Sequence, residues 1–410
     1  MLLLHTSDWH LGRLLCKTKK RYEEFEAFLD WLAALIEQRG VEALLVAGDV
    51  FDTTTPTNRA QRLYYGFIKR LASTGCRHAV VTAGNHDSPS FLEAPAGVLE
   101  ELGVHAVGFG DPIKETLVLR DLQGRPELVV CAVPFLRESD LRLAELGQGW
   151  EAREAALVEG LVAHYREALE QARRLAADFD APAPLAAMGH FFMAGGLTVE
   201  GDGVRTVHAG PLSALPPEVF PAGFDYLALG HLHSPQQVGG DPTKRYSGSP
   251  LPMGFNEIKR PKSVALVDLA PGRPAEVELV EAPVFQELLR LEGDLPHLLA
   301  RIARLRLTGS TAWLELVHSG DGLAPADVRG RLEDALAGSL MDALVIRDLR
   351  TRQLTMAAED AEKALTDMSP AEVFDQLLTD RKVAEADKAW LRAAHAEMRA
   401  AAREDDVRAE

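Results

Sequence analysis

Five short polar segments within the first 233 residues carry the side chains that could perform chemistry. Carboxylate, amide and imidazole groups are the usual oxygen and nitrogen ligands of protein-bound metal ions. The segments are Asp8-Trp9-His10, Gly48-Asp49, Gly84-Asn85-His86-Asp87, Gly189-His190 and Gly230-His231-Leu232-His233. The seven candidate ligands in them are Asp8, His10, Asp49, Asn85, His190, His231 and His233. This number is too large for one ion and suits two ions that share a bridging carboxylate.

Each segment taken alone also has an ordinary structural interpretation. Asp8 can cap a turn beside a surface histidine, and Asp49 can form an Asx-turn. Asn85 can belong to a polar turn, and a single histidine such as His190 is more often structural than a ligand. Every segment nevertheless follows an apolar run or ends one, and this shared context favours a metal site over five unrelated turns.

The elements that must position these segments alternate between strand-like and helix-like sequence. Apolar runs at 2–6, 43–47 and 79–83 predict strands, and apolar residues at helical spacing between them predict helices. This alternation predicts an α/β fold with a mostly parallel or mixed sheet, whose strand ends are where ligands bind. We expect helices at 21–39, 58–72, 90–102 and 151–177, and further strands at 117–119, 128–133, 185–188, 226–229, 263–269 and 275–280.

The pattern changes near residue 282. Strands at 286–291, 312–317 and 343–348 alternate with helices at 295–305 and 324–337, which predicts a small α+β domain. From about residue 359 the sequence is charged and helical. We therefore expect three parts, at 1–281, 282–354 and 355–410.

Composition limits the class of protein. The chain has 410 residues, 47% of them hydrophobic, and no apolar run long enough for a membrane span, so we expect a globular cytoplasmic protein without a signal peptide. The cysteines, Cys16, Cys76 and Cys131, form no Cys-x-x-Cys pair, which fits a reducing compartment and argues against a thiolate metal site. A net charge of −17 argues against coating nucleic acid by bulk charge. It does not exclude a nucleic-acid substrate, because metal ions or a partner can supply positive charge.

The five segments together resemble the signature of the calcineurin-like metallophosphoesterases. Ser7-Asp8-Trp9-His10-Leu11-Gly12, Ala47-Gly48-Asp49-Val50-Phe51-Asp52 and Tyr246-Ser247-Gly248-Ser249-Pro250 resemble one branch, the nuclease subunits of bacterial SbcCD complexes. The resemblance implies a metallophosphoesterase sandwich of mixed β-sheets flanked by helices. It also implies a small α+β capping domain that assists DNA binding, and C-terminal helices.

The resemblance also implies roles for individual residues. It implies two manganese ions and cleavage of DNA phosphodiesters, although the ligands alone suit Mn²⁺, Fe²⁺ or Zn²⁺. Two ions about 3.5–4 Å apart can activate a water and clamp a phosphate. His86 is expected to stabilise developing charge or protonate the leaving oxygen, and Asp52 to orient His86. One ion would take Asp8, His10, Asp49 and His233, and the other Asp49, Asn85, His190 and His231.

Partners are implied in the same way. The branch acts on DNA ends and hairpins, forms homodimers through the helices after Asp49, and binds the SbcC ATPase, here through the C-terminal helices. Basic residues in two loops could contact phosphates or simply be solvated. They are Arg13, Lys17, Lys19, Lys20 and Arg21, then Lys244, Arg245, Lys259, Arg260 and Lys262. The apolar residues considered for interfaces are Leu63, Tyr64, Phe67, Ile68, Leu71, Phe91, Leu92, Val98 and Leu99, then Phe374, Leu377, Leu378, Trp390 and Leu391.

Two other functions stay open at this point. One is another enzyme of the superfamily, a phosphoprotein phosphatase or a cyclic-nucleotide phosphodiesterase. The other is a non-catalytic scaffold that keeps a structural metal site. Degenerate ligand positions would support the scaffold, and none of the seven positions is degenerate.

Overall fold

The computed structural model describes residues 1–141, 150–193, 215, 220–320, 323–349, 388 and 391. These residues divide into two compact units. The first comprises Met1–Arg290 with Ser310–Glu315 and Leu340–Leu344, and the second comprises Leu291–Gly309, Leu316–Ser339 and the described residues from Val345 onward. The expected limits at 281 and 354 remain a proposal.

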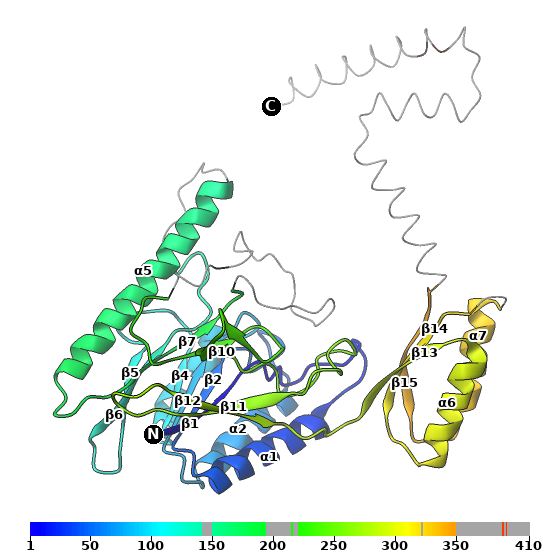
Figure 1. The fold of residues 1–410 in the computed structure, drawn as a ribbon, viewed down its shortest axis with the longest axis horizontal. Helices are drawn as coiled ribbons and strands as arrows, with labels where there is room; N and C mark the ends of the chain where they lie inside the picture. Colours follow the sequence, from blue (N-terminus) through cyan, green and yellow to red (C-terminus); the bar gives the residue numbers. More distant parts are fainter. Residues whose placement is uncertain are drawn as a thin grey trace. The chain divides into compact units, whose positions relative to one another are not determined.

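Two six-stranded sheets form the centre of the first unit (Figure 1). In the first sheet, β1, β2, β3 and β4 run parallel, and β11 and β12 extend it antiparallel beyond β1. Its order is β12-β11-β1-β2-β3-β4. The strands are β1 (Leu2–Thr6), β2 (Ala43–Ala47), β3 (His78–Thr82), β4 (Val104–Val107), β11 (Ser263–Asp268) and β12 (Glu276–Glu281).

The second sheet has the order β5-β6-β7-β8-β10-β9. Strands β6, β7, β8 and β10 run parallel, with an antiparallel strand at each edge. The strands are β5 (Thr116–Arg120), β6 (Pro126–Ala132), β7 (Leu185–His190), β8 (Tyr226–Gly230), β9 (Gln236–Val238) and β10 (Asp241–Tyr246). The parallel strands of both sheets therefore present carboxyl ends from which side chains can converge.

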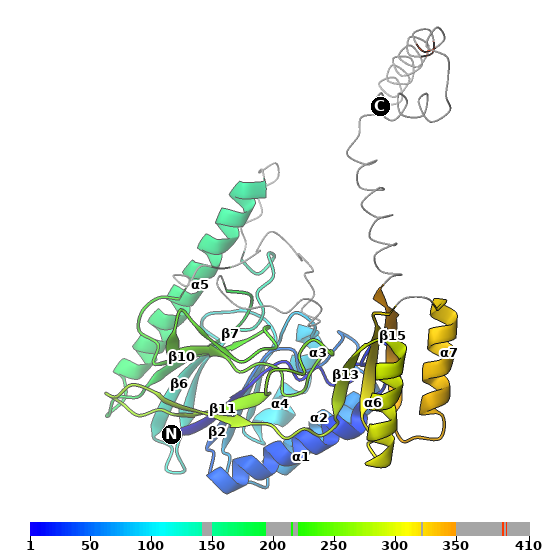
Figure 2. The ribbon, with the colours of Figure 1, turned by 45° about the vertical axis from the view of Figure 1, so that its right-hand side comes forward.

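The helices cover the outer faces of the two sheets, as Figures 1 and 2 show. Helices α1 (Tyr22–Arg39) and α2 (Asn58–Leu71) pack on the first sheet, and α5 (Trp150–Ala177) packs on the second. A third core lies between the sheets, where Leu3, Leu45 and Val80 face Val130 and Met188. Strands buried on both faces explain why the sequence shows continuous apolar runs. The sandwich of mixed sheets flanked by helices is confirmed.

Local sequence explains where the elements begin and end. Helix α1 stops at Gly40, whose left-handed conformation (φ 65°) lets its N–H bond the carbonyls of Ile36 and Glu37. The single helix expected over 90–102 is wrong, because α3 (Pro89–Glu93) and α4 (Ala96–Glu100) are separated at Pro95. Proline lacks the N–H and collides with the preceding helical turn.

Strands β4, β9 and β10 were not expected from the sequence. Strand β10 reads Asp-Pro-Thr-Lys-Arg-Tyr, which has no apolar alternation, and it forms because β8 and β9 pair with it.

A third sheet has three strands in the order β13-β14-β15, and helices α6 and α7, which alternate with these strands along the chain, pack against each other. The strands and helices of this part of the chain are β13 (Leu288–Gly293), α6 (Leu295–Leu307), β14 (Trp313–His318), α7 (Pro325–Leu336) and β15 (Asp342–Asp348). The expected C-terminal helices lie outside the described residues, apart from Lys388 and Leu391.

Within the described part of the chain, no helix combines the length and the apolar character that crossing a membrane requires.

Candidate metal centre

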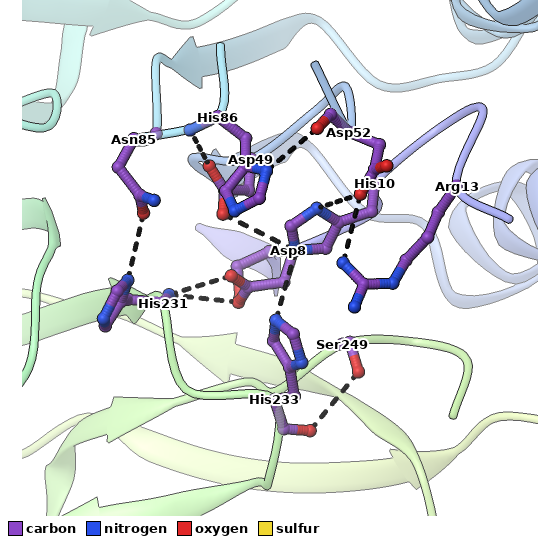
Figure 3. A network of polar contacts seen from close by, with 12 residues as sticks. Asp8, His10, Arg13, Asp49, Asp52, Asn85, His86, His231, His233 and Ser249 are labelled. Atoms are coloured by element: carbon purple, nitrogen blue, oxygen red, sulfur yellow. Dashed lines mark hydrogen bonds and ion pairs between the residues drawn. The ribbon is translucent and has the colours of Figure 1, made fainter. Parts of the chain in front are cut away.

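All seven candidate ligands lie at the carboxyl ends of parallel strands, five strands contributing from the two sheets. Figure 3 labels all of them except His190. The first sheet brings the acidic residues and the second brings most of the histidines. Asp8 and His10 follow β1, Asp49 follows β2, Asn85 and His86 follow β3, His190 ends β7, and His231 and His233 follow β8.

The backbone is strained at the ligands themselves. Among the described residues, six that are not glycine have a positive φ, and four of the six are candidate ligands. They are Asp8 (53°), His10 (46°), Asp49 (51°) and His231 (97°). Such conformations cost of order 1–3 kcal/mol each and persist where the surrounding fold enforces them. The buried strands on either side supply that constraint.

Asp8, His10 and His233 form one half of the centre. The Nε2 atoms of His10 and His233 lie 3.1 Å apart, and Asp8 accepts hydrogen bonds from the His231 N–H at 2.9 and 3.2 Å. The ligand atoms of Asp8, His10 and His233 lie within 4.8 Å of one another. All three residues are buried.

Asp49, Asn85, His190 and His231 form the other half. His190 Nε2 lies 3.1 Å from Asn85 Oδ1 and 3.4 Å from Asp49 Oδ2, and His231 Nδ1 lies 3.1 Å from the same Asn85 oxygen. Asp49 Oδ2 is also 3.5 Å from His10 Nε2. One carboxylate oxygen therefore lies between the two halves.

The donor atoms fit cations. His190 Nδ1 lies 2.9 Å from the carbonyl oxygen of Ala47, which can only accept, so Nδ1 carries the hydrogen and in the neutral ring Nε2 presents a lone pair. His10 and His233 each have Nδ1 near a carboxylate, so in their neutral forms the two Nε2 lone pairs face each other. Lone pairs converging in this way repel unless a proton or a metal ion lies among them.

The pKa shifts of His190 and Asp49 show that these two residues attract positive charge. Burial lowers the pKa of His190, but the Asp49 carboxylate outweighs burial and raises it to about 9. Burial raises the pKa of Asp49, but His190 and His10 bring it well below its ordinary value. Burial and the neighbouring His190 lower the pKa of His231 to about 3, so this ring stays neutral and free to bind a metal.

His86 lies beside the centre, with its ring centroid 4.8 Å from that of His10. Its main-chain N–H donates to Asp49 Oδ1 at 2.8 Å. His86 Nδ1 donates to the main-chain carbonyl of Asp52 at 2.9 Å, so Asp52 contacts His86 through its backbone and not through its carboxylate. The Asp52 carboxylate instead lies 3.4 Å from His10 Nδ1 and accepts from Arg13 at 3.1 Å. His86 also forms a group with His10 and Asp49 whose ligand atoms lie within 4.8 Å of one another.

Two residues support His233 in ways that the sequence did not predict. Glu257 Oε1 lies 3.3 Å from His233 Nδ1, and its other oxygen accepts from Lys262. Burial raises the pKa of Glu257, but Lys262 and His233 outweigh burial and bring it to about 2. Neither residue belongs to a polar segment that follows a strand, so no sequence signal singled out Glu257, and Lys262 was considered only for phosphate contact.

Asp87 is a third supporting residue, present in the Gly-Asn-His-Asp segment but given no role there. It is buried and accepts from the N–H groups of Val50, Phe51 and Gly84 at 2.9–3.1 Å. Burial and the nearby Asp49 raise the pKa of Asp87 to about 6. The hydrogen bonds of Asp87 thus connect the loop after β3 to the loop after β2.

Three of the basic residues considered for phosphate contact are buried. Arg21 pairs with Glu24, Lys262 pairs with Glu257, and Arg245 lies within β10 at 5% exposure. These three side chains cannot lie along a solvated DNA backbone, so that expectation is wrong for them. Of the apolar residues considered for an interface between Leu63 and Leu99, most belong to the core, whereas Val98 is 70% exposed.

Comparisons with known proteins agree with this geometry. The calcineurin-like phosphoesterase model matches residues 1–235, and the model of the type 5 capsule protein repressor C-terminal domain matches residues 284–382. The SbcD subunit of the SbcCD nuclease from Escherichia coli K12 is 35% identical over 381 residues, which is 92% of each chain. The corresponding protein from Rhodobacter capsulatus is 40% identical over 317 residues, 75% of this chain and 76% of that protein. That of Bacillus subtilis is 35% identical over 340 residues, 82% and 81% of the two chains.

These matches cover the five polar segments and most of the chain beyond them. The chain therefore belongs to the calcineurin-like phosphoesterase family and, within it, to the SbcD group of nuclease subunits.

Proposed function

We propose that this chain is the metal-dependent nuclease subunit of an SbcCD complex and hydrolyses DNA phosphodiesters with two divalent cations, Mn²⁺ being the proposed metal. The observation that carries the proposal is Asp49 Oδ2, which lies 3.5 Å from His10 Nε2 and 3.4 Å from His190 Nε2. A carboxylate between two sets of donors suits a pair of ions rather than one. Bound there, two cations would supply an activated water and offset the charge of the phosphate.

The side chains of this site would bind the two cations and supply a proton to the leaving oxygen. Asp8, His10, Asp49 and His233 would hold one cation, and Asp49, Asn85, His190 and His231 the other. His86 would hold or donate a proton at Nε2 towards the leaving oxygen, because Nδ1 is occupied by the Asp52 carbonyl. A positioned group of this kind contributes roughly 10²–10⁴-fold.

The names of the relatives support the rest of the proposal. They are subunits of SbcCD nucleases, so we propose that this chain acts with an SbcC ATPase bound through residues 355–410. We also propose double-strand exonuclease and hairpin endonuclease activity, a homodimer and a cytoplasmic location in DNA repair and recombination. Free cysteines, including the buried Cys76 and Cys131, fit such a compartment.

A nuclease assay with added Mn²⁺ tests the proposal, comparing linear DNA, hairpin DNA and a small phosphodiester, with and without SbcC and ATP. We expect cleavage of DNA, and a loss of about 10²–10⁴-fold in His86→Ala with metal content unchanged. A protein that hydrolyses only the small ester would contradict a DNA substrate. Near-normal rates in His86→Ala would contradict the role of that residue.

A further inference from the structure

The histidines in the two halves of the centre are supported differently. His233 Nδ1 faces the Glu257 carboxylate at 3.3 Å, and His10 Nδ1 faces the Asp52 carboxylate at 3.4 Å. We infer that Glu257 is a positioning residue for His233, and that carboxylate support makes the Asp8–His10–His233 half the tighter of the two metal positions. The inference rests on the proposed function and deepens it.

The other half has neutral support. His190 Nδ1 donates to the Ala47 carbonyl, whereas His231 Nδ1 lies beside the ligand oxygen of Asn85 and is itself one of the converging donor atoms. A carbonyl fixes the tautomer of a histidine but carries no full charge. A carboxylate also strengthens the donor power of the ring, and loss of such a support typically costs 10–100-fold in metal affinity.

Glu257 is itself held rigidly. Its Oε2 accepts from the Met253 N–H at 3.0 Å and from Lys262 Nζ. Lys262 Nζ also donates to the main-chain oxygen of His233 and to Ser249 Oγ, each at 2.9 Å. Glu257 and Lys262 are 1% and 6% exposed. Lys262 therefore connects the Glu257 carboxylate to the main chain of His233. These contacts leave the His233 ring little freedom to rotate.

A glutamine in place of Glu257 should change which nitrogen of His233 carries the hydrogen. An ionised carboxylate only accepts, so His233 Nδ1 keeps its hydrogen and Nε2 keeps its lone pair for the metal. A glutamine amide can donate as well as accept, which permits the opposite tautomer, with the hydrogen on Nε2. Glu257→Gln should therefore weaken the metal position that His233 serves while leaving the opposite position as it is.

The chain offers a matched control. Glu115 and His164 form another buried carboxylate–imidazole pair, with Glu115 Oε1 2.6 Å from His164 Nε2. Neither residue belongs to the metal centre. Glu115→Gln thus makes the same chemical change to a buried pair without touching a candidate ligand.

Mn²⁺ binding to the full-length protein tests the inference, by calorimetry for stoichiometry and affinity and by electron paramagnetic resonance for the state of the ions. We expect wild type and Glu115→Gln to bind two ions and give the spectrum of a spin-coupled pair. Glu257→Gln should bind one ion about 10–100-fold more weakly and give a single-ion spectrum at low loading. The double variant Glu257→Gln/Lys262→Met, which also removes the buried ammonium, should behave the same and covers the case that the single variant does not fold.

Wild-type affinity at both positions in a folded Glu257 variant would overturn the inference, as would an equal loss in Glu115→Gln. A wild-type protein that binds no Mn²⁺ would overturn the proposed function itself, and the two failures are thereby distinguished.

Discussion

Gly84 lies where the loop after β3 touches the loop after β2, and replacing it with alanine should damage the metal centre directly. A Cβ at this position would lie 2.8 Å from Asp49 Cγ and closer still to the main-chain nitrogen and Oδ1 of Asp49. Ordinary contact begins at 3.4 Å. Asp49 cannot swing aside, because His86 N–H holds its Oδ1 and its backbone nitrogen is one of the atoms struck.

The size of the effect follows from these distances. The Asp49 carboxyl carbon must retreat by at least 0.6 Å, the difference between 3.4 and 2.8 Å. Binding constellations tolerate about 0.5 Å, and a misplacement of about 1 Å can cost roughly 10²-fold in rate. Overpacking also costs about 1–3 kcal/mol of stability. We therefore expect Gly84→Ala to lose roughly 10²-fold in turnover, to bind Mn²⁺ more weakly and to unfold at lower urea concentration.

Gly66→Ala is the control. Gly66 lies within α2, and a Cβ there would meet nothing within 4 Å. Alanine in a helix interior should stabilise the protein by about 0.5–1 kcal/mol and leave activity alone. Urea unfolding of the metal-free proteins, calorimetry with Mn²⁺ and a nuclease assay would be compared for both variants. If Gly84→Ala matched Gly66→Ala in metal affinity and rate, the argument from steric contact with Asp49 would be refuted.

Two further changes probe the bridging carboxylate and a buried histidine. Asp49→Ala should abolish paired Mn²⁺ binding, because both halves of the centre share this residue; calorimetry that still showed two bound ions would contradict the bridge. His5 is buried, and burial followed by Arg245 lowers its pKa from 6.5 to about 3. Between these values the unfolded chain binds a proton that the folded chain does not, so stability falls as the pH falls through this window. His5→Asn should reduce that slope by about 1.4 kcal/mol per pH unit between about pH 4 and 6 in urea unfolding. Equal slopes would show that His5 is not held neutral.

That the candidate ligands would lie close together could be predicted from the sequence, because their positions depend on short-range rules. Asp8, Asp49 and His190 each lie at the end of a buried strand, and the parallel strands bring these ends together. The role of Asp52 was not accessible in the same way. The chain passes through a left-handed residue at Asp49 (φ 51°), after which strand alternation no longer tells where a side chain points. As a result the Asp52 carboxylate contacts His10, and only its carbonyl contacts His86.

The supporting pair on His233 shows a second limit. Glu257 and Lys262 lie between β10 and β11, in a polar stretch that suggests a solvated loop. Both are buried and contact His233, which follows β8 and lies more than 20 residues earlier in the chain, so no local sequence pattern predicts the contact. A basic residue near a site is therefore ambiguous in sequence: Lys262 suggested a phosphate contact, and in the fold it neutralises a carboxylate.

The division of ligands between the sheets links the chemistry to the stability of the fold. Asp8 and Asp49 come from the first sheet, whereas His190 and His233 come from the second, and between the sheets lies an apolar core. An ion bound by residues from both sheets would connect the two sheets at the carboxyl ends of their parallel strands. Because the ligands converge only when the sheets are packed, the ion binds the folded chain and not the unfolded one. At a free concentration of 100 times its Kd, such an ion adds about 2.7 kcal/mol to stability, which is comparable to the strain of one or two left-handed ligands. The metal would therefore offset part of the backbone strain that the site requires, and this strain is sustained in the metal-free protein by the packing of the sandwich alone.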